Sequence, residues 1–144
     1  MANSPFLTRM VRRLFEMRWL ASVILLIVLD VATYFALREG SGRSMPFEHF
    51  DKVLHCVAFV GLSMLGYIAL RFDWFIRWRR SHLVLGIFNM LIWLLYGGMI
   101  EILHAYLPYR DASWGDFLAN AVGTLVGQSI AWSFKFYPEW LGDE

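Results

Sequence analysis

The sequence has little charge, almost no cysteine and few prolines for its length. Of its 144 residues only 17% are charged, one is cysteine and four are proline, whereas 58% are hydrophobic. A soluble domain has about 25% charged and about 45–50% apolar residues, and a chain this short cannot hide such an apolar excess from water. The composition therefore excludes an ordinary soluble domain and indicates a protein of the lipid bilayer.

Other missing features exclude further classes of function. The net charge of +1 gives no reason to expect a nucleic-acid partner. The single Cys56 cannot form an intrachain disulfide and lies in an apolar run, so we interpret it as a small core residue. The chain contains no glycine-rich phosphate loop, nucleophile elbow or His-Glu-x-x-His motif. Any chemistry must therefore come from a less common arrangement of residues.

Four segments are long enough to cross a bilayer, which takes about 20 mostly apolar residues. They are Trp19–Leu37, Val53–Leu70, Leu83–Leu103 and Phe117–Phe136. The first follows basic residues, as a signal peptide does, but it is long, contains Asp30 and lacks a small-residue cleavage site after it, so we expect a retained anchor. We predict an all-α integral membrane four-helix bundle that forms a single domain over residues 1–144.

The basic residues are distributed unevenly between the two sides of this predicted bundle. One side carries nine of them: Arg9, Arg12, Arg13, Arg18, Arg71, Arg77, Arg79, Arg80 and Lys135. The other side carries four: Arg38, Arg43, Lys52 and Arg110. Cytoplasmic loops are enriched in lysine and arginine. We therefore expect both termini to be cytoplasmic.

This topology brings polar residues from three segments to one membrane level, on the non-cytoplasmic side. Each segment carries there a polar pair three or four residues apart: Asp51 with His55, Glu101 with His104, and Asp116 with Asn120. Residues at these spacings project from one helix face. Ionised groups are costly in hydrocarbon, so we expect the pairs to face one another around a shared pocket. We expect the deeper Asp30 to pair with this cluster or to accept hydrogen bonds from a neighbouring helix.

The residue types in the cluster fit two kinds of site. Lys52 and Arg110 are typical of a phosphate or pyrophosphate clamp, and the other candidate substrate contacts are Asp51, His104 and Asn120. The candidates for a general base are Glu101, Asp116 and His55. The second kind of site is a divalent metal with the ligands His55, Glu101, His104 and Asp116. A di-iron bundle is not indicated, because it needs two Glu-x-x-His motifs and the chain has one.

Small residues recur every four positions in the fourth segment, at Ala119, Gly123 and Gly127. This interval lets two helix backbones approach closely. We predict that this face packs against another helix, with Asn120 next to it.

Two blocks of the sequence resemble the VanZ-like membrane family. The first is Asp51-Lys52-Val-Leu-His55, which is similar to that family's Asp-Lys-x-x-His element. The second runs from Glu101-x-x-His104 through Arg110 to Asp116, Asn120, Gly123 and Gly127. The resemblance covers about residues 50–130. His104 stands where the family usually has glutamine, and this departure favours a metal or proton role particular to this chain.

The resemblance implies a bacterial inner-membrane protein of the cell envelope, in a family named for a protein associated with teicoplanin resistance. It does not supply a reaction. Our leading hypothesis is an outward-facing pocket that binds a membrane lipid or lipid-linked envelope precursor with an anionic head group, with hydrolysis or transfer left open. One alternative is a non-enzymatic accessory protein that docks on an envelope enzyme or a second copy. Another is a proton or ion pathway, which the apolar inner halves of the second and third segments disfavour.

Overall fold

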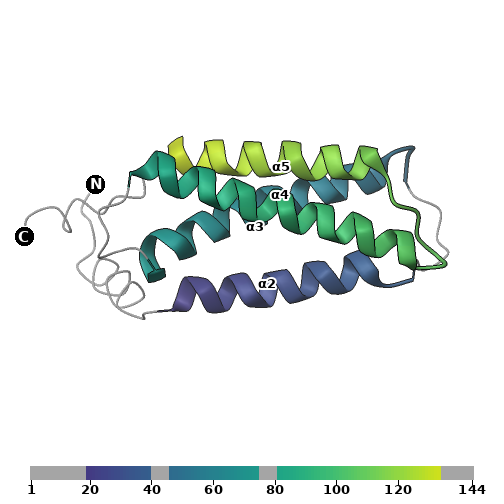
Figure 1. Ribbon diagram of the computed structural model, residues 1–144, viewed down its shortest axis with the longest axis horizontal. Coiled ribbons are helices and arrows are strands. Elements are labelled where there is room, and N and C mark those ends of the chain that lie inside the picture. The colour runs from purple at the N-terminus through teal and green to yellow at the C-terminus, as the bar shows by residue number, and fades with distance from the viewer. Residues whose placement is uncertain (1–18, 40–45, 75–80, 134–144) are drawn as a thin grey trace, which may run out of the picture.

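The computed structural model describes residues 19–39, 46–74 and 81–133, and within these ranges the predicted all-α bundle is confirmed. Its four long helices run side by side along one axis (Figure 1): α2 (Leu20–Leu37), α3 (Phe50–Ala69), α4 (His82–Tyr106) and α5 (Trp114–Ser133). A short π-helical segment, η1 (Leu70–Trp74), continues α3. Most of the basic residues behind the predicted orientation lie outside the described ranges: Arg9, Arg12, Arg13, Arg18, Arg43, Arg77, Arg79, Arg80 and Lys135.

Three of the helices, α2, α3 and α4, are long and apolar enough to cross a membrane. α5 is as long as α3 but more polar, with four polar residues at intervals of four along one face: Asp116, Asn120, Thr124 and Gln128. All four are buried, whereas the opposite side exposes Leu118, Val122 and Leu125. A helix that turns its polar face inward and its apolar face outward suits a lipid environment, where exposed polar groups are costly.

Two helices begin three residues earlier than the apolar segments predicted. α3 starts three residues before Val53 and α5 three residues before Phe117. The added first turns contain Asp51 and Asp116. Carboxylates are favourable near a helix N-terminus, where backbone N–H groups point outward. A hydropathy criterion leaves these polar turns out, although the helices include them.

The closest helix contact is between α3 and α5, and it depends on the predicted glycines. A Cβ atom added at Gly123 would overlap the carbonyl of Cys56, and one at Gly127 would overlap the carbonyl of Val60. Both glycines are buried. The prediction that this face packs against another helix is therefore confirmed for the two glycines. Their contact turns the polar face of α5 toward α3 and α4.

A neutral polar layer lies buried in the middle of the bundle, and the sequence analysis did not anticipate it. We call it the middle layer; it consists of Ser63, Asn89, Trp93, Thr124 and Gln128. Asn89 Nδ2 donates to Ser63 O at 2.9 Å and to Gln128 Oε1 at 2.8 Å, and Asn89 Oδ1 accepts from Trp93 Nε1 at 3.0 Å. Ser63 Oγ donates to the Thr124 carbonyl at 3.0 Å. These bonds join α3, α4 and α5 in the buried interior.

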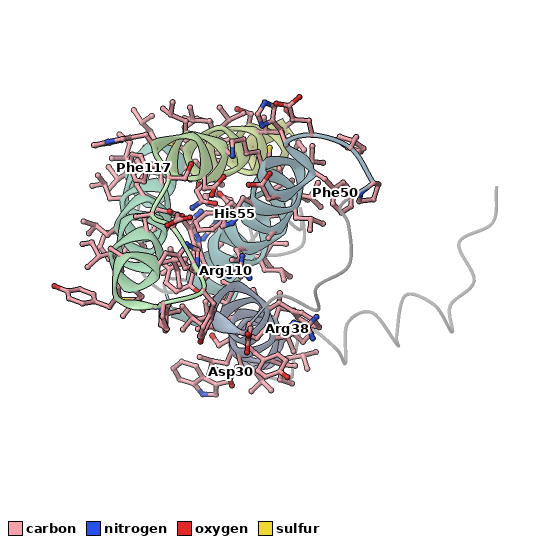
Figure 2. All side chains as sticks on the ribbon, turned by 90° about the vertical axis from the view of Figure 1, so that its right-hand side faces the viewer. Asp30, Arg38, Phe50, His55, Arg110 and Phe117 are labelled. Carbon is pink, nitrogen blue, oxygen red and sulfur yellow. The ribbon has the colours of Figure 1, made fainter. Side chains whose placement is uncertain are left out.

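α2 lies at the side of the other three helices and has no buried residue. A few polar contacts hold it. The Ser22 amide donates to Asp73 Oδ2 at 2.7 Å, and the Thr33 and Tyr96 hydroxyls are 2.7 Å apart. The expectation that Asp30 pairs with the polar cluster is wrong, because Asp30 is exposed on α2 and lies well apart from His55 (Figure 2). Its side chain faces the surroundings of the bundle.

Candidate functional site

Polar side chains from three helices meet at the end of the bundle where α4 ends and α3 and α5 begin, which we call the site end. Figure 2 looks along the bundle from there and shows His55 in the centre. One ligand atom each from His55, Glu101 and Asp116 lie within 4.8 Å of one another. The predicted convergence is therefore confirmed. We call the surrounding group the site cluster: Asp51, Lys52, His55, Glu101, His104, Asp116 and Asn120.

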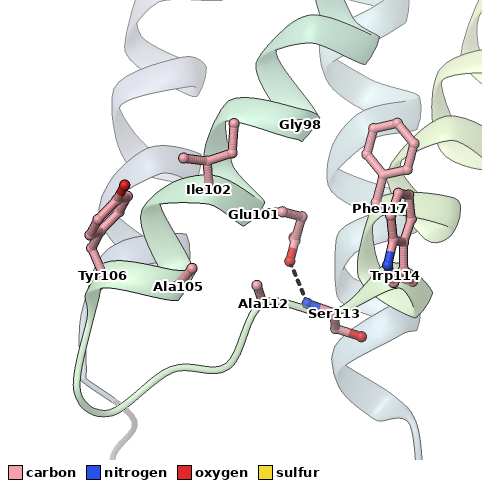
Figure 3. A pocket seen from close by; sticks show the side chains of 9 residues that line it. All are labelled: Gly98, Glu101, Ile102, Ala105, Tyr106, Ala112, Ser113, Trp114 and Phe117. Carbon is pink, nitrogen blue, oxygen red and sulfur yellow. Dashed lines mark hydrogen bonds between the residues drawn. The ribbon is translucent and has the colours of Figure 1, made fainter.

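The start of α5 positions the carboxylates of Glu101 and Asp116. The Ser113 hydroxyl accepts a hydrogen bond from the Asp116 amide at 3.4 Å, and the Ser113 amide donates to Glu101 Oε2 at 3.0 Å (Figure 3). In a capping box, the acid at the third helical position would accept that second bond. Here Glu101 of α4 accepts it, so the Asp116 carboxylate can turn toward α3. Sequence reasoning missed Ser113, although Ser-x-x-Asp is the signature of such a start.

Lys52 lies between two carboxylates. Its ammonium nitrogen is 2.9 Å from Asp116 Oδ1 and 3.1 Å from Asp51 Oδ2. The contact to Asp116 joins the first turns of α3 and α5. Since two carboxylates share this ammonium, the positive charge of Lys52 is already compensated within the cluster. Lys52 would therefore attract an added phosphate only weakly.

Arg110 is directed toward α2 and not toward Lys52. Its Nη2 donates to the Phe35 carbonyl at 3.3 Å and to the Arg38 carbonyl at 3.2 Å. These carbonyls belong to the end of α2, where backbone acceptors have no partner within the helix. Figure 2 shows Arg110 between His55 and α2. Lys52 thus bonds to carboxylates of α3 and α5, whereas Arg110 bonds to carbonyls at the end of α2.

The hydrogen bonds of the two histidines define which ring nitrogens carry protons. His55 Nδ1 lies 3.0 Å from Asn120 Oδ1, an amide oxygen that can only accept, so Nδ1 donates and Nε2 of the neutral ring keeps its lone pair. By the same argument, His104 Nε2 donates to the Ala36 carbonyl at 3.1 Å. His104 Nδ1 then faces Glu101 Oε2 at 3.5 Å.

The site cluster contains buried polar atoms without partners. Glu101 is 8% exposed and Asp116 7%. Among the residues that the structure describes, neither Glu101 Oε1 nor Asn120 Nδ2 has a hydrogen-bond partner, and both atoms are buried. The cluster also holds three carboxylates, of Asp51, Glu101 and Asp116, against one ammonium. A buried polar atom without a hydrogen bond costs free energy, and the excess of carboxylates adds to this cost, so the arrangement favours binding of a further group.

Two cavities flank the site cluster. The α2 cavity, about 380 Å³, lies between α2 and the helices α3 and α4; it is lined by Asp51, His55, Arg110 and otherwise mostly apolar side chains. The α4/α5 cavity, about 460 Å³, lies between the end of α4 and the start of α5, with Glu101 and Ser113 in its wall (Figure 3). Since His55 lines one cavity and Glu101 the other, the cluster separates the two.

In comparisons with known proteins, no family model matches the chain, and no curated protein or solved structure shows significant similarity to it. The VanZ-like resemblance therefore depends on the two residue blocks alone. The geometry adds that residues of both blocks lie in one cluster, since His55 of the first contacts Asn120 of the second.

Proposed function

We propose that this chain is a bacterial inner-membrane protein of the cell envelope that binds a lipid-linked envelope precursor through its anionic head group. The site end would face the periplasm or exterior. The observation that carries the proposal is the α2 cavity, because it is polar at one end and apolar along its length. Such a cavity suits an amphiphile whose head lies at the membrane surface and whose chain lies among the helices.

The two ends of the α2 cavity match the two parts of such a molecule. The polar end carries Asp51, His55 and Arg110, while Phe59 and Leu62 belong to the apolar part. Arg110 is the cation in this wall, and its Nε is buried without a partner among the described residues. An arginine with free N–H groups binds phosphate oxygens well. Since α2 has no buried residue, it is the helix that can move most easily to admit a lipid chain into the cavity.

The site cluster holds groups able to move protons beside that head group. The lone pair of His55 Nε2 and the carboxylates of Glu101 and Asp116 are the candidate general bases. A base must lie within hydrogen-bond reach of the proton that it removes, and His55 lines the cavity wall itself. These groups fit hydrolysis or transfer at a lipid-linked phosphate. The resemblance to the VanZ-like family supports the link to the envelope and to glycopeptide resistance.

Binding and turnover of polyprenyl phosphate and polyprenyl pyrophosphate by the purified protein in nanodiscs test this proposal. We expect Arg110→Ala to weaken binding at least tenfold and Glu101→Gln to abolish turnover, with Asp30→Asn as the charge-matched control. Ala32→Phe fills the α2 cavity and should block binding, whereas Ala105→Phe, which fills the α4/α5 cavity, should not. Unchanged binding and turnover in both Arg110→Ala and Glu101→Gln would refute the proposal.

One observation favours a second candidate, a non-enzymatic accessory protein. Three residues near the end of α4 bond to backbone carbonyls at the end of α2: His104 to Ala36, Tyr109 to Leu37, and Arg110 to Phe35 and Arg38. These bonds fix α2 in place, as a structural network would. This candidate predicts that His104→Ala and Arg110→Ala lower the stability of the protein or its copurification with an envelope enzyme. It also predicts that the wild-type protein has no turnover for the substitutions to reduce.

A further inference from the structure

We propose that His55, Glu101 and Asp116 bind one divalent transition-metal ion, with Zn²⁺ as the best-fitting candidate. Each residue comes from a different helix, and their ligand atoms lie within 4.8 Å of one another. Ligands on a tetrahedral Zn²⁺ are about 3.3 Å apart, given bonds of about 2.0–2.1 Å. Small side-chain rotations would bring the three ligand atoms from within 4.8 Å of one another to this shorter separation. Three protein ligands leave a fourth position open, as in catalytic zinc sites.

The orientation of His55 supports a ligand role. Because its Nδ1 donates to Asn120 Oδ1 at 3.0 Å, its Nε2 keeps the lone pair that a metal requires. Histidines that bind metals commonly donate their other ring nitrogen to an oxygen acceptor in this way, and the acceptor fixes the ring. Asn120 is 1% exposed, so water cannot easily replace His55 as its hydrogen-bond partner. Asn120 is therefore a positioning residue of the proposed site.

The state of Glu101 is an independent indication that a group binds here. Its side chain is nine-tenths buried, and Oε1 has no hydrogen-bond partner in the described part of the chain. Oε2 is already held by the Ser113 amide. Asp116 is in a similar position, since Lys52 contacts its Oδ1 and leaves Oδ2 for a further bond. Each carboxylate is thus fixed through one oxygen and keeps the other for an ion.

The geometry gives a smaller ligand set than the sequence indicated. His104 donates from Nε2 to the Ala36 carbonyl, and its Nδ1 is 3.5 Å from the Glu101 oxygen that binds Ser113. It is also not part of the group of three ligand atoms. One imidazole and two carboxylates suit Zn²⁺ or Mn²⁺ better than Mg²⁺, because imidazole selects for the transition metals. We therefore assign three ligands and place His104 outside the set.

A bound divalent ion would change what the site can hold. Without it, Asp51 and Asp116 share one ammonium and Glu101 adds a third carboxylate, so the cluster itself offers no site for an anion. With it, the open coordination position can accept an anionic oxygen at the boundary between the two cavities. The metal site goes beyond the proposed function and is tested apart from it, because metal binding is measured without lipid. With an ion bound, His55, Glu101 and Asp116 would act as its ligands and not as general bases.

The test uses the untagged, full-length protein in detergent, stripped of metal with a chelator and titrated with Zn²⁺ by calorimetry. We expect one Zn²⁺ per chain, and a loss of affinity of at least 100-fold in His55→Gln, Glu101→Gln and Asp116→Asn. Asn120→Leu should weaken binding about 10–100-fold, as loss of an orienting partner does. Asp30→Asn and His49→Gln are the controls, since both residues are exposed and outside the cluster.

Two further measurements separate metal binding from misfolding. Elution volume and thermal unfolding of each variant without metal show whether the bundle is intact. The visible absorption of bound Co²⁺ should show a tetrahedral nitrogen–oxygen site in the wild-type protein and in His104→Gln. Wild-type protein that binds no more Zn²⁺ than folded Glu101→Gln would overturn the proposal, and loss of the Co²⁺ spectrum in folded His104→Gln would overturn the three-ligand assignment.

Discussion

The two buried polar layers of this bundle differ in charge and in the space around them. In the middle layer, neutral groups bond to one another across α3, α4 and α5, although Thr124 Oγ1 and Gln128 Nε2 have no partner among the described residues. In the site cluster, charged groups share partners unequally, Glu101 Oε1 has none among the described residues, and cavities lie on both sides. The difference teaches that burial alone does not mark a site. Both layers contain unpaired atoms, but the site cluster combines them with an excess of carboxylates and with cavities that a ligand can enter.

Both layers depend on the close approach of α3 and α5, so the largest effect should come from a glycine between them. A methyl group at Gly123 meets the Cys56 carbonyl, and we expect Gly123→Ala to lower the free energy of unfolding by about 3 kcal/mol, the upper range for overpacking. Gly61→Ala is the matched control, because a Cβ there meets nothing within 4 Å. Denaturant unfolding followed by circular dichroism measures both. Equal losses would show that the glycine contact does not control the packing.

The next largest effect should separate the layers. Asn89→Leu removes the bonds to Ser63, Trp93 and Gln128 and leaves buried polar groups without partners. We expect a loss of about 2 kcal/mol in stability, with Zn²⁺ affinity unchanged. Ser129→Ala is the control, because its hydroxyl is exposed and donates to the Leu125 carbonyl of its own helix. A large loss of Zn²⁺ affinity in folded Asn89→Leu would mean that the two layers act as one.

A change of opposite sign is expected in the site cluster. In the presence of a chelator, Glu101→Gln should raise the free energy of unfolding by about 1 kcal/mol, because it replaces a buried carboxylate that has an unpaired oxygen. Added Zn²⁺ should then stabilise the wild-type protein, since a ligand that binds only the folded state raises stability. It should not stabilise the variant. A destabilised Glu101→Gln without metal would assign the cluster to structure, as for the middle layer.

The smallest effect concerns His104, which belongs to the site cluster and also contacts α2. A glutamine amide can also donate to the Ala36 carbonyl, so His104→Gln should change stability by less than about 0.5 kcal/mol. His104→Ala should cost about 1 kcal/mol, the usual worth of a hydrogen bond. Thermal unfolding of the two variants side by side measures the difference. Equal losses would show that the ring itself is needed, and that His104 does more than hold α2.

The site was more predictable from the sequence than the rest of the polar interior. His55, Glu101 and Asp116 are ionisable groups near the ends of apolar segments, where their cost in lipid forces them inward. The middle layer gave no such signal, because single neutral polar residues such as Asn89 and Gln128 are tolerated in an apolar run. The wrong expectation about Asp30 also arose from information that the sequence does not contain. Its depth was readable from the sequence, but the side of α2 on which it lies was not.

The sequence by itself determined the all-α class, the positions of the apolar helices, and the meeting of three polar pairs at one end. Hydrophobic length and the cost of charge in hydrocarbon are properties of short segments, so they can be read along the chain. Only the tertiary structure decided which atoms pair: that Lys52 is shared by two carboxylates, that Arg110 bonds to α2, and that Glu101 Oε1 finds no partner in the described part of the chain. Hydrogen bonds depend on ångström distances between side chains far apart in sequence, and packing of the helices sets those distances.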